Sequence, residues 1–286
     1  MRRSPEQMLA CILDAARSDE RIRAVTMEGS RANPNALHDQ YSDFDICWFV
    51  TDARDFTRDR SFLKAFGETL ILQCPDDWYD HPYDYNGHAH FAYLIQFTDG
   101  NRIDLSIRDL RNLAEETAYN EPRAVLLDKD GYAELHPVES EAAYYILRPG
   151  EKEYLDTCNE FRWISIYIAK GLCRQQLYYA KYAYDVLAMR QFIKMLSWKI
   201  GIQRNFSVTV GAHGKYFKAY LSPSELARFH GIFPGGDYAE IWEKLFVFYD
   251  YFAELAAFTA AALGFAFNET ETRKIRIFLK NMRDGL

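Results

Sequence analysis

The spacing of hydrophobic residues changes near Pro149-Gly150, and this change most restricts how the 286-residue chain can fold. Before it, short runs alternate between hydrophobic and polar residues, as in strands, whereas after it long runs repeat at a helical spacing. Pro137 lies in the same transition. We therefore expect an α/β (α+β) domain with a mixed sheet over residues 1–140, followed by an all-α helical bundle over residues 141–286.

Two helices and several short strands are expected in the first half. Ser4 and Pro5 suit the start of a helix over residues 5–17, where hydrophobic side chains repeat at a helical spacing. Asp99-Gly100 predicts a tight hairpin. The other expected elements are a short helix at 61–66 and strands at 21–27, 44–50, 69–73, 91–97, 102–107 and 124–127.

Helices are expected throughout the second half. Breaks fall at Gly201, at 211–214 and at Pro234-Gly235-Gly236, where glycine and proline disfavour regular structure. The predicted helices cover residues 151–174, 177–200, 223–230 and 238–262.

The net charge and the cysteine content restrict the kinds of partner that the chain can bind and the cellular compartment that suits it. The net charge of −7 disfavours a nucleic-acid backbone as the main partner and favours metal ions or cationic small molecules. The five cysteines are odd in number and lack a CxxC pair, which argues against zinc knuckles and disulfides. The N-terminus lacks the apolar segment of a secretory signal, and the apolar stretch near 256–267 is short for a membrane span. We expect a cytoplasmic monomer that binds neither nucleic acid nor membrane.

Residues suited to phosphate and metal chemistry are concentrated between Gly29 and Asp45. Gly29-Ser30 follows a predicted strand directly, and such a turn can point backbone N–H groups at an anion. Asp43 and Asp45 lie two positions apart at the start of the next strand. Their carboxylates therefore share one face, about 6.6 Å apart along the strand, while the alternate hydrophobic residues face the core.

A third carboxylate lies on the second strand of the predicted hairpin. Asp104 alternates with Ile103 and Leu105, so it points away from the core. If this strand lies beside residues 44–50, Asp104 joins Asp43 and Asp45 in a two-metal site. Mg²⁺ suits such a site because it prefers oxygen ligands and keeps positions open for substrate phosphates. Each signal alone is common on solvated surfaces, and the order of all of them along the chain favours the metal interpretation.

This ordered set resembles the nucleotidyltransferase superfamily and its polymerase-β-like fold. The similarity extends to the streptomycin (aminoglycoside) 6-adenylyltransferase family and covers almost the whole chain. It rests on residues 27–45 with Gly29-Ser30-Arg31-Ala32-Asn33, TDGNRIDL at 98–105, VLLDKDG at 125–131, AKGLCR at 169–174, YAKYAYDV at 179–186, and 206–221. Residues 74–90 depart from the family's pattern, which bears on the acceptor that is bound.

The resemblance implies transfer of AMP from MgATP to a hydroxyl of streptomycin or a related aminoglycoside, with release of pyrophosphate. Asp43, Asp45 and Asp104 would then hold Mg²⁺. Gly29 and Ser30 would bind the β- and γ-phosphates, with Arg31 neutralising charge and Lys215 reaching the triphosphate. The alternatives are an arginine packed on Asp39 or Glu28 for Arg31, and a surface lysine for Lys215.

Asp185 is the expected catalytic residue of the second half. On the helix predicted at 177–200 it is the only acid in a stripe of otherwise aromatic and apolar residues, namely Tyr178, Tyr182, Met189, Phe192 and Leu196. An acid on a buried face is either paired or functional. The resemblance favours a general base at Asp185 with Tyr182 contacting the substrate, and the alternative is an ion pair with Lys181 or Arg174.

The segment from Asp76 to Tyr85 is the expected binding site for a cationic acceptor. The segment mixes acids with aromatic residues, and Trp78, Asp80 and Asp84 are its expected binding residues. Carboxylates pair with guanidinium groups, and aromatic faces stack on them. The alternative is a solvated polar loop. The flanking His88 and His90 have no third ligand nearby and argue only weakly for zinc.

Two other functions remain open at this point. The chain could adenylylate a protein hydroxyl, although enzymes of that kind usually lack so large a helical domain. It could also be a non-catalytic nucleotide-binding module, a reading that loss of any of the three acids would favour. All three acids are present.

Overall fold

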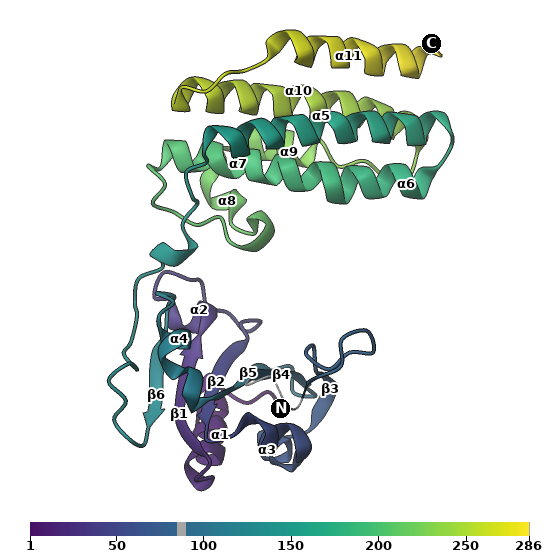
Figure 1. The fold of residues 1–286 in the computed structure, drawn as a ribbon. Coiled ribbons are helices and arrows are strands. Elements are labelled where there is room, and N and C mark those ends of the chain that lie inside the picture. The colour runs from purple at the N-terminus through teal and green to yellow at the C-terminus, as the bar shows by residue number, and fades with distance from the viewer. Residues whose placement is uncertain (85–89, 286) are drawn as a thin grey trace. The chain divides into compact units, whose positions relative to one another are not determined.

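The computed structural model describes residues 1–84 and 90–285. They form two compact units, Met1–Ala143, which contains the sheet, and Tyr144–Leu286, which is helical (Figure 1). The α/β fold followed by a helical region is therefore confirmed. The division falls between Pro137 and Gly150, where the hydrophobic spacing changes.

The first unit is built on a six-stranded mixed sheet with the order β3-β4-β5-β2-β1-β6. Every expected strand is present: β1 (Ile22–Glu28), β2 (Phe44–Val50), β3 (Thr69–Gln73), β4 (His90–Phe97), β5 (Arg102–Asp109) and β6 (Ala124–Asp128). β2 and β5 run parallel, and the other neighbouring strands are antiparallel. This one parallel pair places the beginnings of β2 and β5 side by side.

The two faces of the sheet are covered differently. The alternate residues Phe44, Ile46, Trp48 and Val50 belong to the core that α1 (Pro5–Ser18) closes with Met8, Ile12 and Ala16. α3 (Ala53–Arg58) and the 3₁₀ helix η1 (Ser61–Phe66) add Phe56 and Phe66 to this core. On the opposite face Cys47 and Phe49 pack with Leu113 of α4 (Leu113–Thr117). The predicted inward face of β2 is confirmed, whereas the short helices α3 and α4 were not expected.

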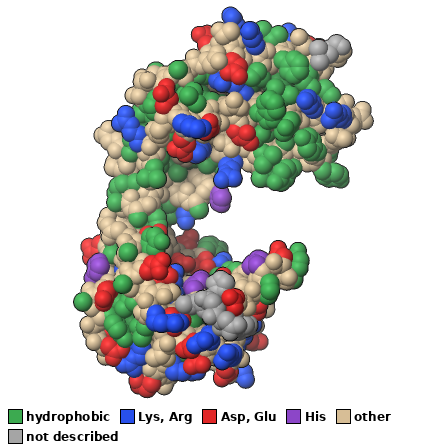
Figure 2. Space-filling model, in the orientation of Figure 1, with side chains coloured by type: hydrophobic (Ala, Val, Ile, Leu, Met, Phe, Trp, Pro, Cys, Tyr) green, Lys and Arg blue, Asp and Glu red, His purple; other side chains and the backbone are tan. Residues whose placement is uncertain are grey.

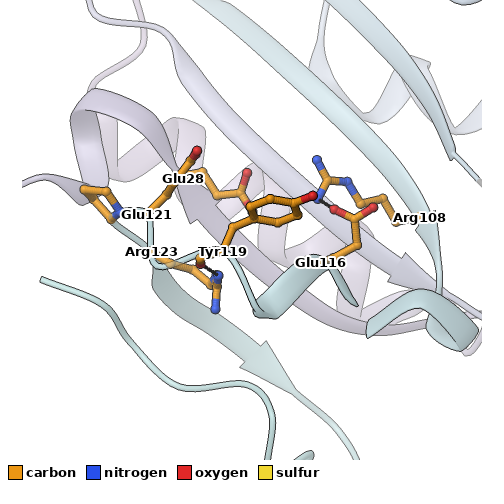
Figure 3. Close-up of a pocket in the computed structure, with 7 residues that line it drawn as sticks. Glu28, Arg108, Glu116, Tyr119, Glu121 and Arg123 are labelled. Carbon is orange, nitrogen blue, oxygen red and sulfur yellow. Dashed lines mark hydrogen bonds and ion pairs between the residues drawn. The ribbon is translucent and has the colours of Figure 1, made fainter. Parts of the chain in front are cut away.

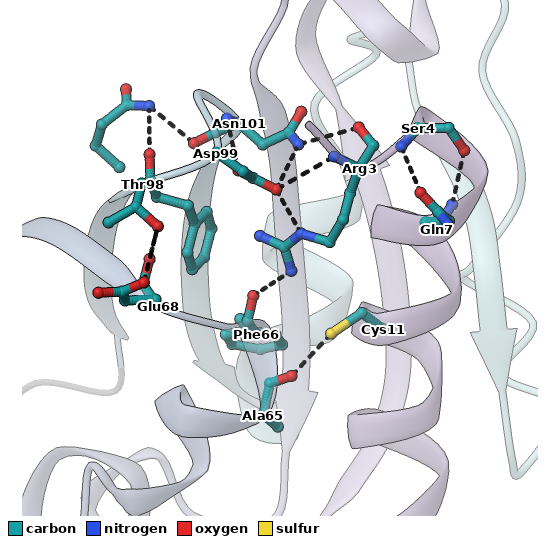
Figure 4. Close-up of polar contacts among 12 residues, drawn as sticks. Arg3, Ser4, Gln7, Cys11, Ala65, Phe66, Glu68, Thr98, Asp99 and Asn101 are labelled. Carbon is teal, nitrogen blue, oxygen red and sulfur yellow. Dashed lines mark hydrogen bonds and ion pairs between the residues drawn. The ribbon is translucent and has the colours of Figure 1, made fainter. Parts of the chain in front are cut away.

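The turn between β4 and β5 is tied to the N-terminal segment (Figure 4). The Nε of Arg3 donates to Oδ2 of Asp99 at 2.6 Å, and its Nη1 donates to the carbonyl of Phe66. In return, Nδ2 of Asn101 donates to the carbonyl of Arg3 at 3.2 Å. Arg3 thus binds both Asp99 and Asn101, the residue just before β5, and these contacts fix the backbone at the start of that strand.

The second unit is a set of helices around one core. Its long helices are α5 (Glu151–Cys173), α7 (Met189–Gln203), α10 (Tyr238–Leu263) and α11 (Glu269–Asp284). α6 (Leu177–Tyr182), α8 (Phe217–Tyr220) and α9 (Pro223–His230) are shorter. The turn η5 (Ala212–Gly214) also belongs to this unit, and η3 (Ala142–Tyr144) spans the division. The short elements α2 (Gly29–Ala32) and η2 (Leu110–Asn112) belong to the first unit. α11 was not expected, because its few inward residues are spread among charges.

The helix predicted at 177–200 contains a π-helical turn, η4 (Ala183–Ala188), between α6 and α7. Its buried residues repeat every four positions and are fully inaccessible to solvent: Ala180, Tyr184, Ala188, Phe192 and Leu196. A wider turn keeps this spacing in phase, whereas an α-helix of 3.6 residues per turn would drift. The predicted single stripe is therefore wrong, because Tyr178, Tyr182 and Asp185 lie on the exposed side and only Met189, Phe192 and Leu196 lie inside.

α10 is long and apolar enough to pass for a membrane-spanning helix, with a mean hydropathy of 1.3 over 18 residues. However, 56% of that window is buried within the helical unit. Phe248, Phe252 and Leu255 pack into the core there. Burial of this kind is what the central helix of a bundle shows.

Candidate functional site

Asp45 and Asp104 face each other across the parallel strands β2 and β5. Phe44 pairs with Ile103 in the same register, and Asp43 comes just before β2 on the face that carries Asp45. The expected neighbour relation between these two strands is confirmed. Three carboxylates consequently start from adjoining backbone positions on one face of the sheet.

Gly29 is the first residue of α2 and follows β1 without a loop. Its φ is +64°, and a Cβ placed on it would lie 2.1 Å from Oδ2 of Asp45. A contact that short is a steric overlap, so any side chain here would displace the carboxylate. The glycine expected to shape an anion-binding turn therefore also makes room for Asp45.

Burial and neighbouring acids raise the pKa of Asp45 to about 6. Burial is the largest cause, followed by the charges of Asp104, Asp43 and Glu28. Burial also raises the pKa of Asp43, while the nearby Arg102 opposes that change. A cation placed among such acids offsets their mutual repulsion and favours their ionised forms.

The donor set suits a hard divalent cation, because three carboxylates from two rigid strands supply oxygen ligands only. Within residues 1–84 and 90–285, however, no three His, Cys, Asp or Glu side chains converge on one point. Arg102 lies between two of these carboxylates. Its guanidinium binds Asp104 through Nε at 2.7 Å and Nη2 at 2.8 Å, and its Nη1 lies 3.5 Å from Oδ2 of Asp43.

Arg31 and Ser30 lie in α2, and both form hydrogen bonds to the segment between α2 and β2. Arg31 donates from Nε to the carbonyl of Asp43 at 2.9 Å and from Nη2 to the carbonyl of Ser42 at 2.8 Å. Its guanidinium also lies 3.9 Å from the ring centre of Phe44, and burial lowers its pKa. The carbonyl of Ser30 lies 2.8 Å from Nε2 of His38. Arg31 thereby connects α2 to the start of β2, and phosphate binding by both residues stays a prediction.

A pocket of about 210 Å³ opens beside this cluster (Figure 3). Its wall includes Glu28, which is paired with Asp45 across β1 and β2. The other lining residues are Arg108, Glu116, Tyr119, Glu121, Pro122 and Arg123. In the described part of the chain, Arg108 Nε and Arg123 Nη1 are buried without a hydrogen-bond partner. The pocket consequently offers donors as well as carboxylates, and sequence analysis did not identify it.

The acids of the predicted acceptor segment are of two kinds: two accept hydrogen bonds from backbone amides, and two are exposed to solvent. Asp76 accepts a hydrogen bond from the Ala92 amide at 2.8 Å, and Asp77 accepts one from the Tyr83 amide at 3.2 Å. Trp78, Asp80 and Asp84 are exposed, and Asp80 lies 2.7 Å from Nδ1 of His81. Tyr85 and His88 lie outside the described residues. The segment thus holds its own shape while offering two acids and a tryptophan to solvent.

Asp185 lies on the exposed side of the π turn and forms an ion pair with Lys181. Hydrophobic side chains gather on the face of the helical unit where Figure 1 labels α6 (Figure 2). This exposed group comprises Tyr178, Tyr179, Tyr182 and Val186. The alternative pairing with Lys181 is thus present, and π turns of this kind occur frequently at functional sites.

Lys215 belongs to the helical unit, whereas Gly29, Ser30 and Arg31 belong to the sheet unit. It is exposed and directly follows the turn η5, which is preceded by Gly211 and ends at Gly214, two glycines of positive φ. Its ammonium group lies 5.0 Å from the ring centre of Tyr216. A role for Lys215 at the triphosphate stays a prediction.

Two side chains that sequence analysis missed lie against the carboxylates. Arg102 lies two positions before Asp104 on one strand, a spacing that puts both on one face. Glu28 directly precedes the Gly29-Ser30 turn. Only Arg102 carried a signal of this kind, because the position of Glu28 opposite Asp45 depends on the pairing of β1 with β2.

Known proteins similar to this chain span nearly its whole length. The profile of the family described as "Streptomycin adenylyltransferase" matches residues 1–282. The chain is 34% identical over 266 residues to an aminoglycoside 6-adenylyltransferase of Bacillus subtilis (strain 168), covering 93% of both proteins. It is 34% identical over 265 residues to one of Campylobacter jejuni, covering 93% of this chain and 91% of that one. A crystal structure of an aminoglycoside 6-adenyltransferase from Bacillus subtilis matches with a TM-score of 0.49 and 31% identity, covering 98% of this chain and 99% of that one.

Proposed function

The chain belongs to the streptomycin adenylyltransferase family, and from this membership we propose that it transfers AMP from ATP to a hydroxyl of an aminoglycoside. It is a nucleotidyltransferase enzyme, and the relatives at 34% identity are aminoglycoside 6-adenylyltransferases. The observation that carries the proposal is the register of Asp45 with Asp104, with Asp43 on the same face and Gly29 against Asp45.

The proposed reaction makes one bond and breaks one. The acceptor oxygen bonds to the α-phosphorus of ATP, the bond from that phosphorus to the bridging oxygen breaks, and pyrophosphate leaves. Asp43, Asp45 and Asp104 would hold Mg²⁺, which supplies positive charge to the phosphate oxygens as charge develops. Gly29 and Ser30 would cradle the outer phosphates.

The hydroxyl proton needs an acceptor on the side of the aminoglycoside. We assign this role to Asp185, because an exposed carboxylate among tyrosines suits a polar, cationic ring. Tyr182 would then contact the same ligand. Lys215 is assigned to the triphosphate as a cation on an exposed glycine-flanked turn.

A cationic acceptor also fits the exposed acids of the sheet unit. Asp80 and Asp84 face solvent beside Trp78, an arrangement that pairs with and stacks on guanidinium or ammonium groups. Streptomycin, which carries guanidinium groups, is the acceptor we propose first. Because the reaction consumes ATP, we place it in the cytoplasm.

The test is to incubate the full chain with ATP, Mg²⁺ and a panel of aminoglycosides, and then to measure their masses. We expect one compound to gain a single AMP unit, with pyrophosphate released in equal amount. The matched control is Asp104→Asn, which removes one proposed metal ligand. AMP appearing on protein instead would point to a protein hydroxyl as acceptor. ATP binding without transfer to any acceptor would point to a non-catalytic nucleotide-binding module.

A further inference from the structure

Arg102 lies between two of the three proposed metal ligands. Its Nε and Nη2 contact both oxygens of Asp104, at 2.7 and 2.8 Å, and its Nη1 lies 3.5 Å from Asp43. A carboxylate that accepts a bidentate guanidinium pair has used the lone pairs with which it would ligate a metal in the same direction. A divalent cation that approaches from the side occupied by this guanidinium can therefore bind both carboxylates only after the guanidinium moves.

The surroundings of Arg102 let its side chain move while its backbone stays in place. The turn before it is fixed by Arg3, Asp99 and Asn101. Its side chain, in contrast, is 38% exposed and is bound through the guanidinium alone. Exposed ion pairs of this type contribute little to folding stability, so their geometry exchanges readily.

The charge of Arg102 replaces part of what a metal would supply. Asp43, Asp45, Asp104 and Glu28 repel one another, and Arg102 offsets the charge on two of them. Asp45, which lies against Gly29, receives no hydrogen bond from Arg102 within the described residues. The guanidinium thus leaves the oxygens of Asp45 available to a divalent cation.

We propose that the Arg102 guanidinium occupies the position between Asp43 and Asp104 in which these carboxylates would hold a divalent cation, and that with the cation bound Arg102 would instead bind the phosphates of ATP. A planar guanidinium suits both positions, because it matches carboxylate and phosphate oxygens in the same bidentate geometry. Arg102 is thereby a positioning residue toward the metal and a binding residue toward the nucleotide. The first role rests on the proposed metal site, and the second rests on the proposed function as a whole.

The chain contains a matched control for this exchange. Arg54 forms the same kind of pair with Asp52, two positions away, through Nε at 2.8 Å. Its side chain is 40% exposed, close to that of Arg102. Asp52 lies two positions after Val50, the last residue of β2, at the opposite end of that strand from Asp43. Arg54→Gln therefore removes an equal charge and an equal pair without touching the carboxylate cluster.

The test measures Mn²⁺ binding to the full chain without nucleotide, by electron paramagnetic resonance of the free ion. We expect Arg102→Gln to bind Mn²⁺ about fivefold more tightly than the unaltered protein, because a competing cation is gone. Arg102→Lys should fall between the two, and Arg54→Gln should leave the affinity unchanged. With saturating Mn²⁺, Arg102→Gln should then bind ATP about tenfold more weakly.

Equal or weaker Mn²⁺ binding by Arg102→Gln, with an unchanged circular dichroism spectrum, would overturn the inference. The proposed metal site would survive that result, since the unaltered protein would still bind the ion. Absence of Mn²⁺ binding in both proteins at millimolar concentration would instead overturn the metal site itself, and the inference with it. The two failures are therefore distinguishable in one titration.

Discussion

The ammonium group of Lys181 binds Asp185 at 2.9 Å and the carbonyl of Pro234 at 2.8 Å. It therefore links the π turn η4 to the segment before α10. Asp185 can serve this link, a proton transfer, or both, and the two roles respond differently to substitution.

Asp185→Asn is expected to lower kcat by about 10²- to 10⁴-fold while leaving MgATP binding unchanged, because Asn cannot accept a proton. The acidic limb of the pH–rate profile should also disappear. Measuring kcat and Tm on one preparation decides between the roles. A variant that melts earlier yet turns over normally would leave Asp185 only its link to Lys181.

Asp43→Asn and Asp45→Asn should each abolish turnover with the fold intact. The physical reason is that a neutral amide is a poor ligand for Mg²⁺. Activity at fixed Mg²⁺ and circular dichroism are the two measurements. Near-normal turnover in either variant would remove that residue from the proposed metal site.

Asp45→Asn should also make the nucleotide-free protein more stable at pH 7. Because burial and neighbouring acids raise the pKa of Asp45 to about 6 in the folded protein, above its value of 3.8 in an unfolded chain, stability falls as the pH rises from about 4 to 6. Asn has no such loss, so the gain should be of the order of 2 kcal/mol at pH 7 and vanish below pH 4.

Denaturant unfolding at pH 3.5 and pH 7 measures this difference. Mg²⁺ should narrow it, since the ion stabilises only the protein with the full set of carboxylates. Equal stability of the two proteins at both pH values would contradict the raised pKa.

Gly29→Ala should reduce activity by at least about 100-fold, because the new Cβ would push the Asp45 carboxylate away from its partners, and a misplaced catalytic group is costly. Gly131→Ala is the matched control. Gly131 has a similar φ of +72° but nothing within 4 Å of its Cβ position. Both variants should lose about 1–2 kcal/mol of stability from the backbone alone, and only Gly29→Ala should lose activity.

Asp80→Asn combined with Asp84→Asn should raise the KM for the acceptor and leave the KM for ATP unchanged. The effect should shrink at high salt, because screening weakens the attraction in the unaltered enzyme as well. Asp14→Asn combined with Asp156→Asn changes the net charge equally on exposed helices and serves as the control. A shift in the KM for ATP alone would show that the segment is misassigned.

The parts of the site that depend on alternation within one strand could be predicted from the sequence. Period two was sufficient to place Asp43 and Asp45 on one face and Phe44 and Ile46 on the other. Predicting that Asp45 and Asp104 lie side by side required one further assumption, namely that their strands are neighbours. The pairing of β2 with β5 confirms this assumption.

Features that depend on contacts between segments could not be predicted in the same way. The overlap between a Gly29 side chain and Asp45 requires the antiparallel pairing of β1 and β2. The position of Asp185 depended on a π turn, which no residue type marks. The spacing of Arg102 to Asp104 indicates that both lie on one face, but the sequence alone does not show whether a metal ion or a guanidinium binds Asp104.

The π turn η4 holds one residue more than an α-helix needs to turn through the same angle. Removing one residue from 183–188 would therefore restore regular α-helical winding and leave α6 and α7 in nearly their present phase. Tyr178 and Tyr182 would stay on the exposed side, and Phe192 would stay in the core. A single-codon deletion in this segment would therefore reshape only the exposed stretch that carries Asp185 and Val186, and the rest of the helix would keep its packing.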